Sequence, residues 1–215
     1  MTRDQPPVLK VEKLHHSYAP GATAIAEQSF EVAAGEFVSI VGPSGCGKTT
    51  LLKILAGLLK ATSGSVALEG RQVTDVPDGL AMVFQEYSRS LQPWLKVREN
   101  IELPLEYQPI DAATRKARVD ESLEAVSLTG AADRYPWQLS GGMQQRASIC
   151  RALIHQPRLL MLDEPFGALD AFTREELWCV LRDLWEAQRF TVVLVTHDLR
   201  EAAFLADTVY VMSRR

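Results

Sequence analysis

Five short, largely apolar runs are spread along the chain, and they constrain its fold more than any other feature. The runs cover residues 37–41, 81–84, 159–162, 191–195 and 208–212. Apolar runs of this length are typical of strands that are buried on both faces of a parallel sheet. Helical patterns separate several of the runs; Leu51, Ile54 and Leu58, for example, share one helical face. Strands that alternate with helices predict a layered α/β domain built on a parallel sheet.

The remaining segments predict two further kinds of structure. Shorter strands are predicted at residues 9–14, 29–32 and 64–70, where apolar and polar side chains alternate or glycines bound the segment. Residues 95–156 contain no good strand pattern, but Asp111 and Ser140 each precede a helical pattern as plausible N-caps. We therefore expect this stretch to form a helical subdomain inserted between strands.

Composition and charge exclude several classes of protein. The 215 residues carry a net charge of −4, which argues against nucleic acid as the main partner. The three cysteines are scattered, without metal-ligand spacing, which favours a reducing compartment over a disulfide framework. The first 30 residues lack the apolar stretch of a signal peptide, and no segment has the length of a membrane span. We expect a cytosolic protein, whose role at a membrane would depend on a partner.

The sequence GPSGCGKTT follows the first apolar run and fits the P-loop pattern for phosphate binding. Glycines let backbone N–H groups turn toward phosphate oxygens, and the helix that begins near Lys48 directs its positive end at the same anion. Lys48 would neutralise phosphate charge, and the Thr49 hydroxyl would bind Mg²⁺. The candidate site comprises Gly42, Pro43, Ser44, Gly45, Cys46, Gly47, Lys48, Thr49 and Thr50. A glycine-rich turn without a ligand is the structural alternative.

Polar side chains follow two other apolar runs. Asp163 and Glu164 come at the end of the run at 159–162, and His197 follows the run at 191–195. Ligands of open parallel sheets bind at the carboxyl ends of the strands. There Asp163 could hold Mg²⁺, Glu164 could orient or deprotonate an attacking water, and His197 could hydrogen-bond a phosphate. Taken alone, the two carboxylates fit a solvated strand end better and His197 fits a structural residue better; the P-loop on the same chain favours the functional roles.

A second candidate anion site lies in the sequence LSGGMQQR, residues 139–146. Ser140, Gly141 and Gly142 stand at a helix start, where the backbone N–H groups favour an anion. One nucleotide does not need two such sites on one chain, so the pair suggests two copies that each close over the other's phosphates. Ser140 as a simple N-cap is the alternative, although it leaves the two glycines unexplained.

With these motifs in this order, the chain resembles the ATP-binding cassette family of transport ATPases nearly from end to end. Residues 42–50 match its Walker A loop, 139–144 its signature motif, and 159–164 its Walker B strand with a catalytic Glu164. The resemblance implies further roles for Tyr18 in adenine stacking, Gln85 at Mg²⁺ and in sensing the membrane partner, Asp163 at Mg²⁺, Asp170 in the loop after Walker B, and His197 as the switch histidine. Tyr18 could also be a surface or packing residue.

The resemblance implies a P-loop NTPase (RecA-like) fold with a parallel-sheet core, an N-terminal antiparallel β subdomain and an inserted helical subdomain. One nucleotide-binding domain would span residues 1–215, with an ATP-binding core at about 1–90 and 157–215 and the helical subdomain at about 91–156. Family members usually continue beyond the strand at which this chain stops. Whether Arg215 is a natural end stays open.

The implied function is that of the ATP-hydrolysing subunit of an importer. A homodimer would enclose two MgATP and drive transmembrane permease subunits from the cytoplasmic side, with a solute-binding protein as an indirect partner. Met143, where the family most often has Gln, and residues 85–100 are similar to the branch that imports nitrate, sulfonates and taurine. Candidates for docking the permease are residues 86–98, especially Tyr87 and Ser88, with exposed Leu91, Trp94 and Leu95. Trp94 could instead pack inside the helical subdomain.

Three other functions remain possible on the residues alone. A cassette ATPase of DNA repair or of ribosomes usually carries two cassettes or a coiled-coil insertion, and neither is present in this sequence. A nucleotide-dependent adaptor that does not hydrolyse ATP would have no need of Glu164 and His197. A small-molecule kinase of the P-loop type has no use for the motif at 139–142.

Overall fold

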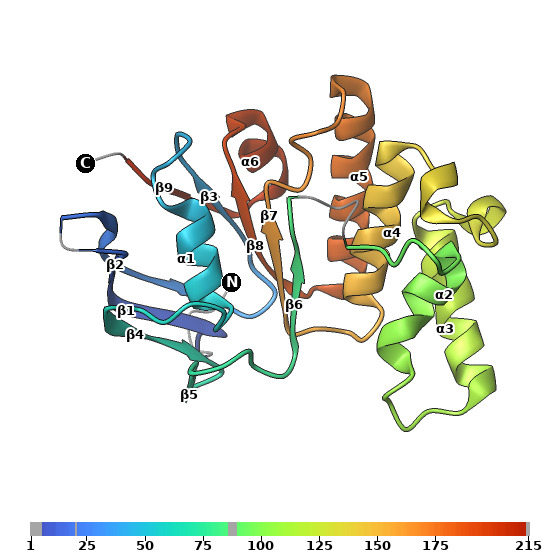
Figure 1. The fold of residues 1–215 in the computed structure, drawn as a ribbon, viewed down its shortest axis with the longest axis horizontal. Coiled ribbons are helices and arrows are strands. Elements are labelled where there is room, and N and C mark those ends of the chain that lie inside the picture. The colour runs from blue at the N-terminus through green and yellow to red at the C-terminus, as the bar shows by residue number, and fades with distance from the viewer. Residues whose placement is uncertain (1–5, 20, 86–89, 214–215) are drawn as a thin grey trace. The chain divides into compact units, whose positions relative to one another are not determined.

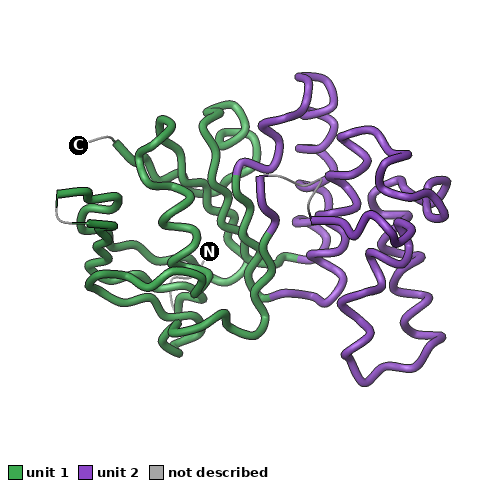
Figure 2. The backbone as a smooth tube through the Cα atoms, viewed as in Figure 1, with its two compact units in different colours: residues 1–82, 158–163, 189–215 green, residues 83–157, 164–188 purple. Residues whose placement is uncertain are grey.

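The computed structural model of the protein describes residues 6–19, 21–85 and 90–213. Contacts between Cα atoms divide the chain into two compact units, coloured separately in Figure 2. Unit 1 comprises residues 1–82, 158–163 and 189–215, and unit 2 comprises residues 83–157 and 164–188.

The five apolar runs form a single sheet, as predicted. Its strands are β3 (Phe37–Val41), β6 (Leu80–Val83), β7 (Leu159–Asp163), β8 (Thr191–Thr196) and β9 (Thr208–Val211), in the spatial order β6-β7-β8-β3-β9 (Figure 1). The pairs β7–β8, β8–β3 and β3–β9 are parallel. Every residue of β3, β7 and β8 is buried, as expected for central strands with neighbours on both sides.

The prediction that all five strands are fully buried is wrong for the two outer ones. In β6 and β9 half-buried or exposed residues alternate with more buried ones, and Val211 of β9 is 77% exposed. Both are edge strands of the sheet, so each has one neighbouring strand instead of two. An apolar run does not distinguish an edge strand from a central strand.

A second, antiparallel sheet completes unit 1 and has the strand order β2-β1-β4-β5. Its strands are β1 (Leu9–Ser17), β2 (Thr23–Val32), β4 (Ser63–Leu68) and β5 (Arg71–Gln72). Leu9 and Leu14 of β1 share one buried cluster with Leu52 and Leu55 of helix α1 (Lys48–Leu55). This shared core anchors the helix that follows the P-loop. Helix α6 (Leu199–Leu205) follows β8.

Unit 2 is helical, and the prediction of a stretch without strands at 95–156 is confirmed for these residues. Its helices are α2 (Val97–Glu102), α3 (Ala112–Ala125), α4 (Gly141–Leu153) and α5 (Ala171–Gln188), with 3₁₀ turns η2 (Leu103–Leu105), η3 (Thr129–Ala131) and η4 (Pro136–Gln138). The Asp111 side chain accepts a hydrogen bond from the Thr114 N–H at 2.9 Å, so it is the predicted N-cap of α3. Among the described residues, no helix is long and apolar enough to cross a membrane.

Candidate functional site

Three predicted site segments of unit 1 follow the same end of the parallel sheet. Val41, the last residue of β3, pairs with Thr196, and Asp163 at the end of β7 pairs with Val195. The P-loop, Asp163 and His197 therefore all lie at the carboxyl ends of adjacent strands. This edge is where open parallel sheets bind their ligands.

The P-loop wraps around the side chain of its own lysine. Lys48 is buried, and its Nζ donates hydrogen bonds to the carbonyl oxygens of Gly42 at 2.8 Å and Pro43 at 3.2 Å. Pro43, Ser44 and Gly45 are exposed. The ammonium group is thus held under an accessible loop, where an anion could approach it.

Gly47 is required at the start of α1 for two reasons. Its φ is +102°, in the left-handed region, and an added Cβ would lie 2.3 Å from the carbonyl oxygen of Ala24. As the N-cap residue of α1 it also has no side chain to accept from the first turn. Helix N-termini with N–H donors available are anion sites, so this geometry suits a phosphate.

Thr49 and Asp163 meet beside the loop. The Thr49 hydroxyl donates to Asp163 Oδ1 at 3.2 Å, although 114 residues separate them in the sequence. Asp163 is buried and Thr49 is exposed. One carboxylate and one hydroxyl beside a phosphate site are the kind of oxygen ligands with which proteins hold Mg²⁺, the remaining ligands being phosphates and water. The residues present therefore fit the ion.

Tyr18 lies beside the first turn of α1, which contains Thr50. It is 63% exposed, its hydroxyl is 3.0 Å from Thr50 Oγ1, and its ring lies at 89° to that of His16 with 4.7 Å between the centroids. An exposed aromatic ring that is held by a hydrogen bond at its hydroxyl and by a neighbouring ring can stack on a planar group. A cavity of about 680 Å³, lined in part by Gly45, Cys46 and residues 23–28 of β2, also borders the loop.

His197 is exposed immediately after β8, and the residues around it are ordered by hydrogen bonds. The Thr196 hydroxyl donates to buried Glu201 at 2.9 Å and accepts from the Asp198 N–H at 3.0 Å. Hydrogen bonds from Arg200 lower the pKa of Asp198 to about 2, so this carboxyl is ionised at neutral pH. These contacts hold the turn that carries His197.

Unit 2 contains the other predicted site residues. Gln85 is exposed, and Glu164 is half-buried with a φ of +44°. Left-handed backbone is uncommon for a residue other than Gly, Asn or Asp, and such strained positions concentrate at functional sites. This backbone conformation was not predictable from the sequence. Other described residues, including Glu69 and Arg189, share it, so it does not by itself assign a role to Glu164.

The predicted signature helix begins as expected, with Ser140 as its N-cap. The Ser140 Oγ accepts from the Met143 N–H at 3.4 Å, and Ser140 is exposed. Gly141 and Gly142, which an N-cap at Ser140 does not explain, differ in their burial and in their neighbours. Gly141 is half-buried, whereas Gly142 is buried and has Thr173 of α5 directly beside it.

The exposure expected for the proposed docking segment at 86–98 is found only in part. Trp94 is 68% exposed, so the alternative that it packs inside the helical subdomain is wrong. Leu91 was expected to be exposed but is buried, and Leu95 is half-buried. Tyr87 and Ser88 lie outside the described residues.

The burial of Leu91 has a local cause. Asn100, fully buried in α2, accepts from the Gln92 N–H at 2.7 Å and donates to the carbonyl oxygens of Gln92 and Leu95 at 3.0 Å. These bonds fold the turn back onto the helix. Trp94, at the tip of that turn, remains exposed.

Two residues that the sequence analysis missed are Thr173 and Glu201. Glu201 accepts a hydrogen bond from Thr196 at the end of β8. The Thr173 hydroxyl donates to Asp170, the residue immediately before α5. An aspartate just before a helical pattern is a typical N-cap, and its partner lies three residues later. This spacing could have revealed the contact between Asp170 and Thr173.

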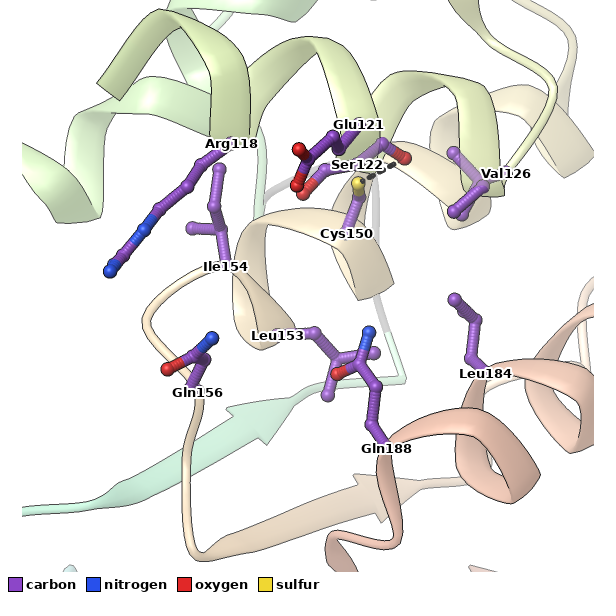
Figure 3. Close-up of a pocket in the computed structure, with 11 residues that line it drawn as sticks. Arg118, Glu121, Ser122, Val126, Cys150, Leu153, Ile154, Gln156, Leu184 and Gln188 are labelled. Atoms are coloured by element: carbon purple, nitrogen blue, oxygen red, sulfur yellow. Dashed lines mark hydrogen bonds between the residues drawn. The ribbon is translucent and has the colours of Figure 1, made fainter. Parts of the chain in front are cut away.

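The cysteines differ in accessibility. A cavity of about 250 Å³ lies between α3, α4 and α5, with Leu153, Leu184 and Gln188 among its lining residues (Figure 3). At its floor, the Cys150 thiol donates to the carbonyl oxygen of Ser122 at 3.1 Å. Burial raises the pKa of Cys150 to about 12. Cys46 is also buried, and Cys179 is exposed.

We expect the native protein to react quickly with one equivalent of a thiol reagent at pH 8, at Cys179. Alkylation requires a thiolate, and Cys150 is almost entirely protonated at that pH because its pKa is far higher. Timed alkylation followed by peptide mass spectrometry measures each site, and Cys179→Ser should remove the fast phase. Fast labelling of Cys150 would contradict the assignment.

The comparisons with known proteins agree with this geometry. The family model described as ABC transporter matches residues 25–167, more than half of the chain. The aliphatic sulfonates import ATP-binding protein SsuB of Bacillus subtilis (strain 168) is 45% identical over 193 residues, which cover 90% of this chain and 74% of that protein. The nitrate import ATP-binding protein NrtD of Synechococcus elongatus is 47% identical over 192 residues, covering 88% and 69%.

Solved structures give the same result. A dimeric ATP-binding cassette in a post-hydrolysis state with ADP and Pi has a TM-score of 0.81 and 35% identity, and the match covers 95% of this chain and 94% of that one. The cbiO1 subunit of a Clostridium perfringens ABC transporter complex has a TM-score of 0.88 and 26% identity, covering 97% and 85%. The sheet, the P-loop and these matches show that the chain belongs to the ABC transporter family and is an ATPase of that family.

Proposed function

We propose that this protein is the ATP-hydrolysing subunit of an importer for a small solute such as nitrate, a sulfonate or taurine, and that it works as a homodimer around two MgATP. The observation that carries the proposal is the cluster at the sheet edge, where Lys48 and the Thr49–Asp163 pair lie at the N-terminus of α1. The printed functions of the similar SsuB and NrtD proteins support the importer assignment.

The first half of the nucleotide site is proposed on unit 1. The backbone N–H groups of residues 42–50 other than Pro43, together with the Lys48 ammonium, bind the β- and γ-phosphates, and the exposed ring of Tyr18 stacks on adenine. Thr49 and Asp163 would hold Mg²⁺. The resemblance assigns Gln85, a residue of unit 2, to the same ion. When bound, the ion neutralises charge on the phosphates.

The second half of the site is proposed on the partner copy. Ser140 and the first turn of α4 present a helix N-terminus, which favours the γ-phosphate of the nucleotide bound by the other copy. In each copy, Asp170 lies in the loop that follows Glu164, and we assign it to the nucleotide-binding residues. Because the γ-phosphate then bridges two molecules, its hydrolysis removes the bridge and the dimer opens.

The chemical step is assigned to Glu164 and His197. Glu164 orients the attacking water and accepts its proton as the water attacks the γ-phosphorus; the bond from that phosphorus to the oxygen shared with the β-phosphate breaks, and ADP leaves. His197, on its hydrogen-bonded turn, donates to the γ-phosphate together with Lys48. These donors stabilise the negative charge that spreads over the transferring phosphoryl group.

The membrane partner is proposed to contact Trp94. This side chain is a large apolar group that α2 and its turn leave 68% exposed, and buried aromatic anchors dominate the energetics of many interfaces. Bound there, the chain would act peripherally at the cytoplasmic side of the membrane. A solute-binding protein would act on it only through the permease.

The proposal can be tested by reconstituting the protein in proteoliposomes with the permease and the binding protein that are encoded beside its gene. Taurine or nitrate outside the vesicles should stimulate ATP hydrolysis. Trp94→Ala should reduce this stimulation about fivefold or more, because an interface anchor is lost. Tyr107→Ala is the matched control, since Tyr107 is an aromatic residue of the same unit that is 89% exposed and lies outside the docking segment. Failure of nitrate, sulfonates and taurine to stimulate would contradict the proposed solute class. Equal loss in both variants would contradict a docking role for Trp94.

A further inference from the structure

The glycine at position 142 is required by the packing of Thr173. A Cβ added to Gly142 would lie 2.4 Å from the Cγ2 methyl of Thr173, which is far shorter than a van der Waals contact. The φ of Gly142 lies outside the left-handed region. Space, and not backbone conformation, is therefore what excludes a side chain at this first turn of α4.

The methyl group of Thr173 cannot turn away without losing or distorting the hydrogen bond that its own hydroxyl makes to Asp170. Asp170 accepts from the Thr173 N–H at 3.0 Å and from the Thr173 hydroxyl at 2.7 Å. Because threonine is β-branched, the position of the bound hydroxyl also determines where the methyl points. The same two bonds lower the pKa of Asp170, which keeps this acceptor ionised.

We infer that Thr173 is a positioning residue for the phosphate-binding first turn of α4, which it locates against the loop at 167–170 through Asp170 and Gly142. The inference rests on the proposed function of that turn. Its consequence is that the two glycines have different tasks. Gly142 must be small to admit Thr173, whatever its own N–H contributes to the phosphate.

A pair of substitutions separates packing from phosphate contact. Serine keeps the hydroxyl that Asp170 accepts but lacks Cγ2, so Thr173→Ser makes room for a methyl at position 142. In a Glu164→Gln background we expect Gly142→Ala to weaken ATP-dependent dimerisation about tenfold or more, as overpacking of a well-packed contact does. The double variant Gly142→Ala/Thr173→Ser should recover to within about threefold of the parent, because the added methyl then fills the vacated space.

The measurements are dimerisation by analytical ultracentrifugation with ATP, binding of a fluorescent ATP analogue to the monomer, and thermal unfolding. Analogue binding should stay unchanged in all variants, since the P-loop belongs to unit 1, whereas a general folding defect would lower it. Gly130→Ala is the matched control, because Gly130 is an exposed glycine of unit 2 with nothing within 4 Å of an added Cβ.

Each outcome decides a different claim. A double variant that remains as defective in dimerisation as Gly142→Ala overturns the positioning role, because the alanine methyl would then obstruct the phosphate itself. Normal dimerisation of Gly142→Ala overturns it as well. If the Glu164→Gln parent stays monomeric with ATP, the proposed dimer is wrong, and the positioning role is lost with it.

Discussion

Replacing Glu164 with Gln should lower the rate of ATP hydrolysis by about 100-fold or more, the range in which a general base contributes. Gln keeps the size of the side chain and tolerates the same backbone, so the φ of +44° is retained while the proton acceptor is lost. Binding of ATP should persist, and dimers should accumulate because the bridging γ-phosphate is not removed. Phosphate release and sedimentation in the presence of ATP and Mg²⁺ measure the two effects.

Glu175→Gln provides the control for this substitution, since Glu175 is an exposed carboxylate on α5. It should hydrolyse ATP at the rate of the unmodified protein. Unimpaired turnover in the Glu164→Gln variant would remove this residue from the chemical step. Loss of turnover together with loss of ATP binding would assign it a structural role.

Replacing Lys48 with Met should weaken ATP binding by about 10- to 100-fold, the effect expected when a charge-assisted hydrogen bond to phosphate is removed. The Lys48 side chain is only 5% exposed, so its replacement must fill the same buried volume. Met does so because its unbranched side chain has nearly the length of the lysine stem. Two hydrogen bonds that organise the loop, to the carbonyl oxygens of Gly42 and Pro43, are lost as well. Isothermal titration with ATP and Mg²⁺ measures the affinity.

Lys53→Met is the matched control for the loop lysine, because Lys53 is an exposed lysine of the same helix. It should bind ATP normally. Circular dichroism and thermal unfolding establish that the Lys48→Met protein is folded. A folded Lys48→Met protein with unchanged affinity would show that the ammonium group does not bind the nucleotide.

Local patterns were enough to predict the sheet and the three segments at its carboxyl edge. The runs at 37–41, 159–162 and 191–195 are buried strands because their side chains are apolar on both faces. The glycines and Lys48 of the P-loop are predictable for a similar reason, since a phosphate cradle needs those residue types at that spacing. The caps at Asp111 and Ser140 also depend on nearby backbone only.

Contacts between distant segments were decided by the tertiary structure. Nothing near Leu91 in the sequence shows that Asn100 folds its turn inward, and the edge position of β9 depends on which strands pair. The reason for glycine at position 142 lies on another helix, where Asp170 fixes the methyl of Thr173. The sequence alone determined which chemical groups this protein carries and in what order, because those follow from residue type and spacing. Only the tertiary structure decided which of them are buried, strained or sterically required, because burial and clash are properties of segments brought together in space.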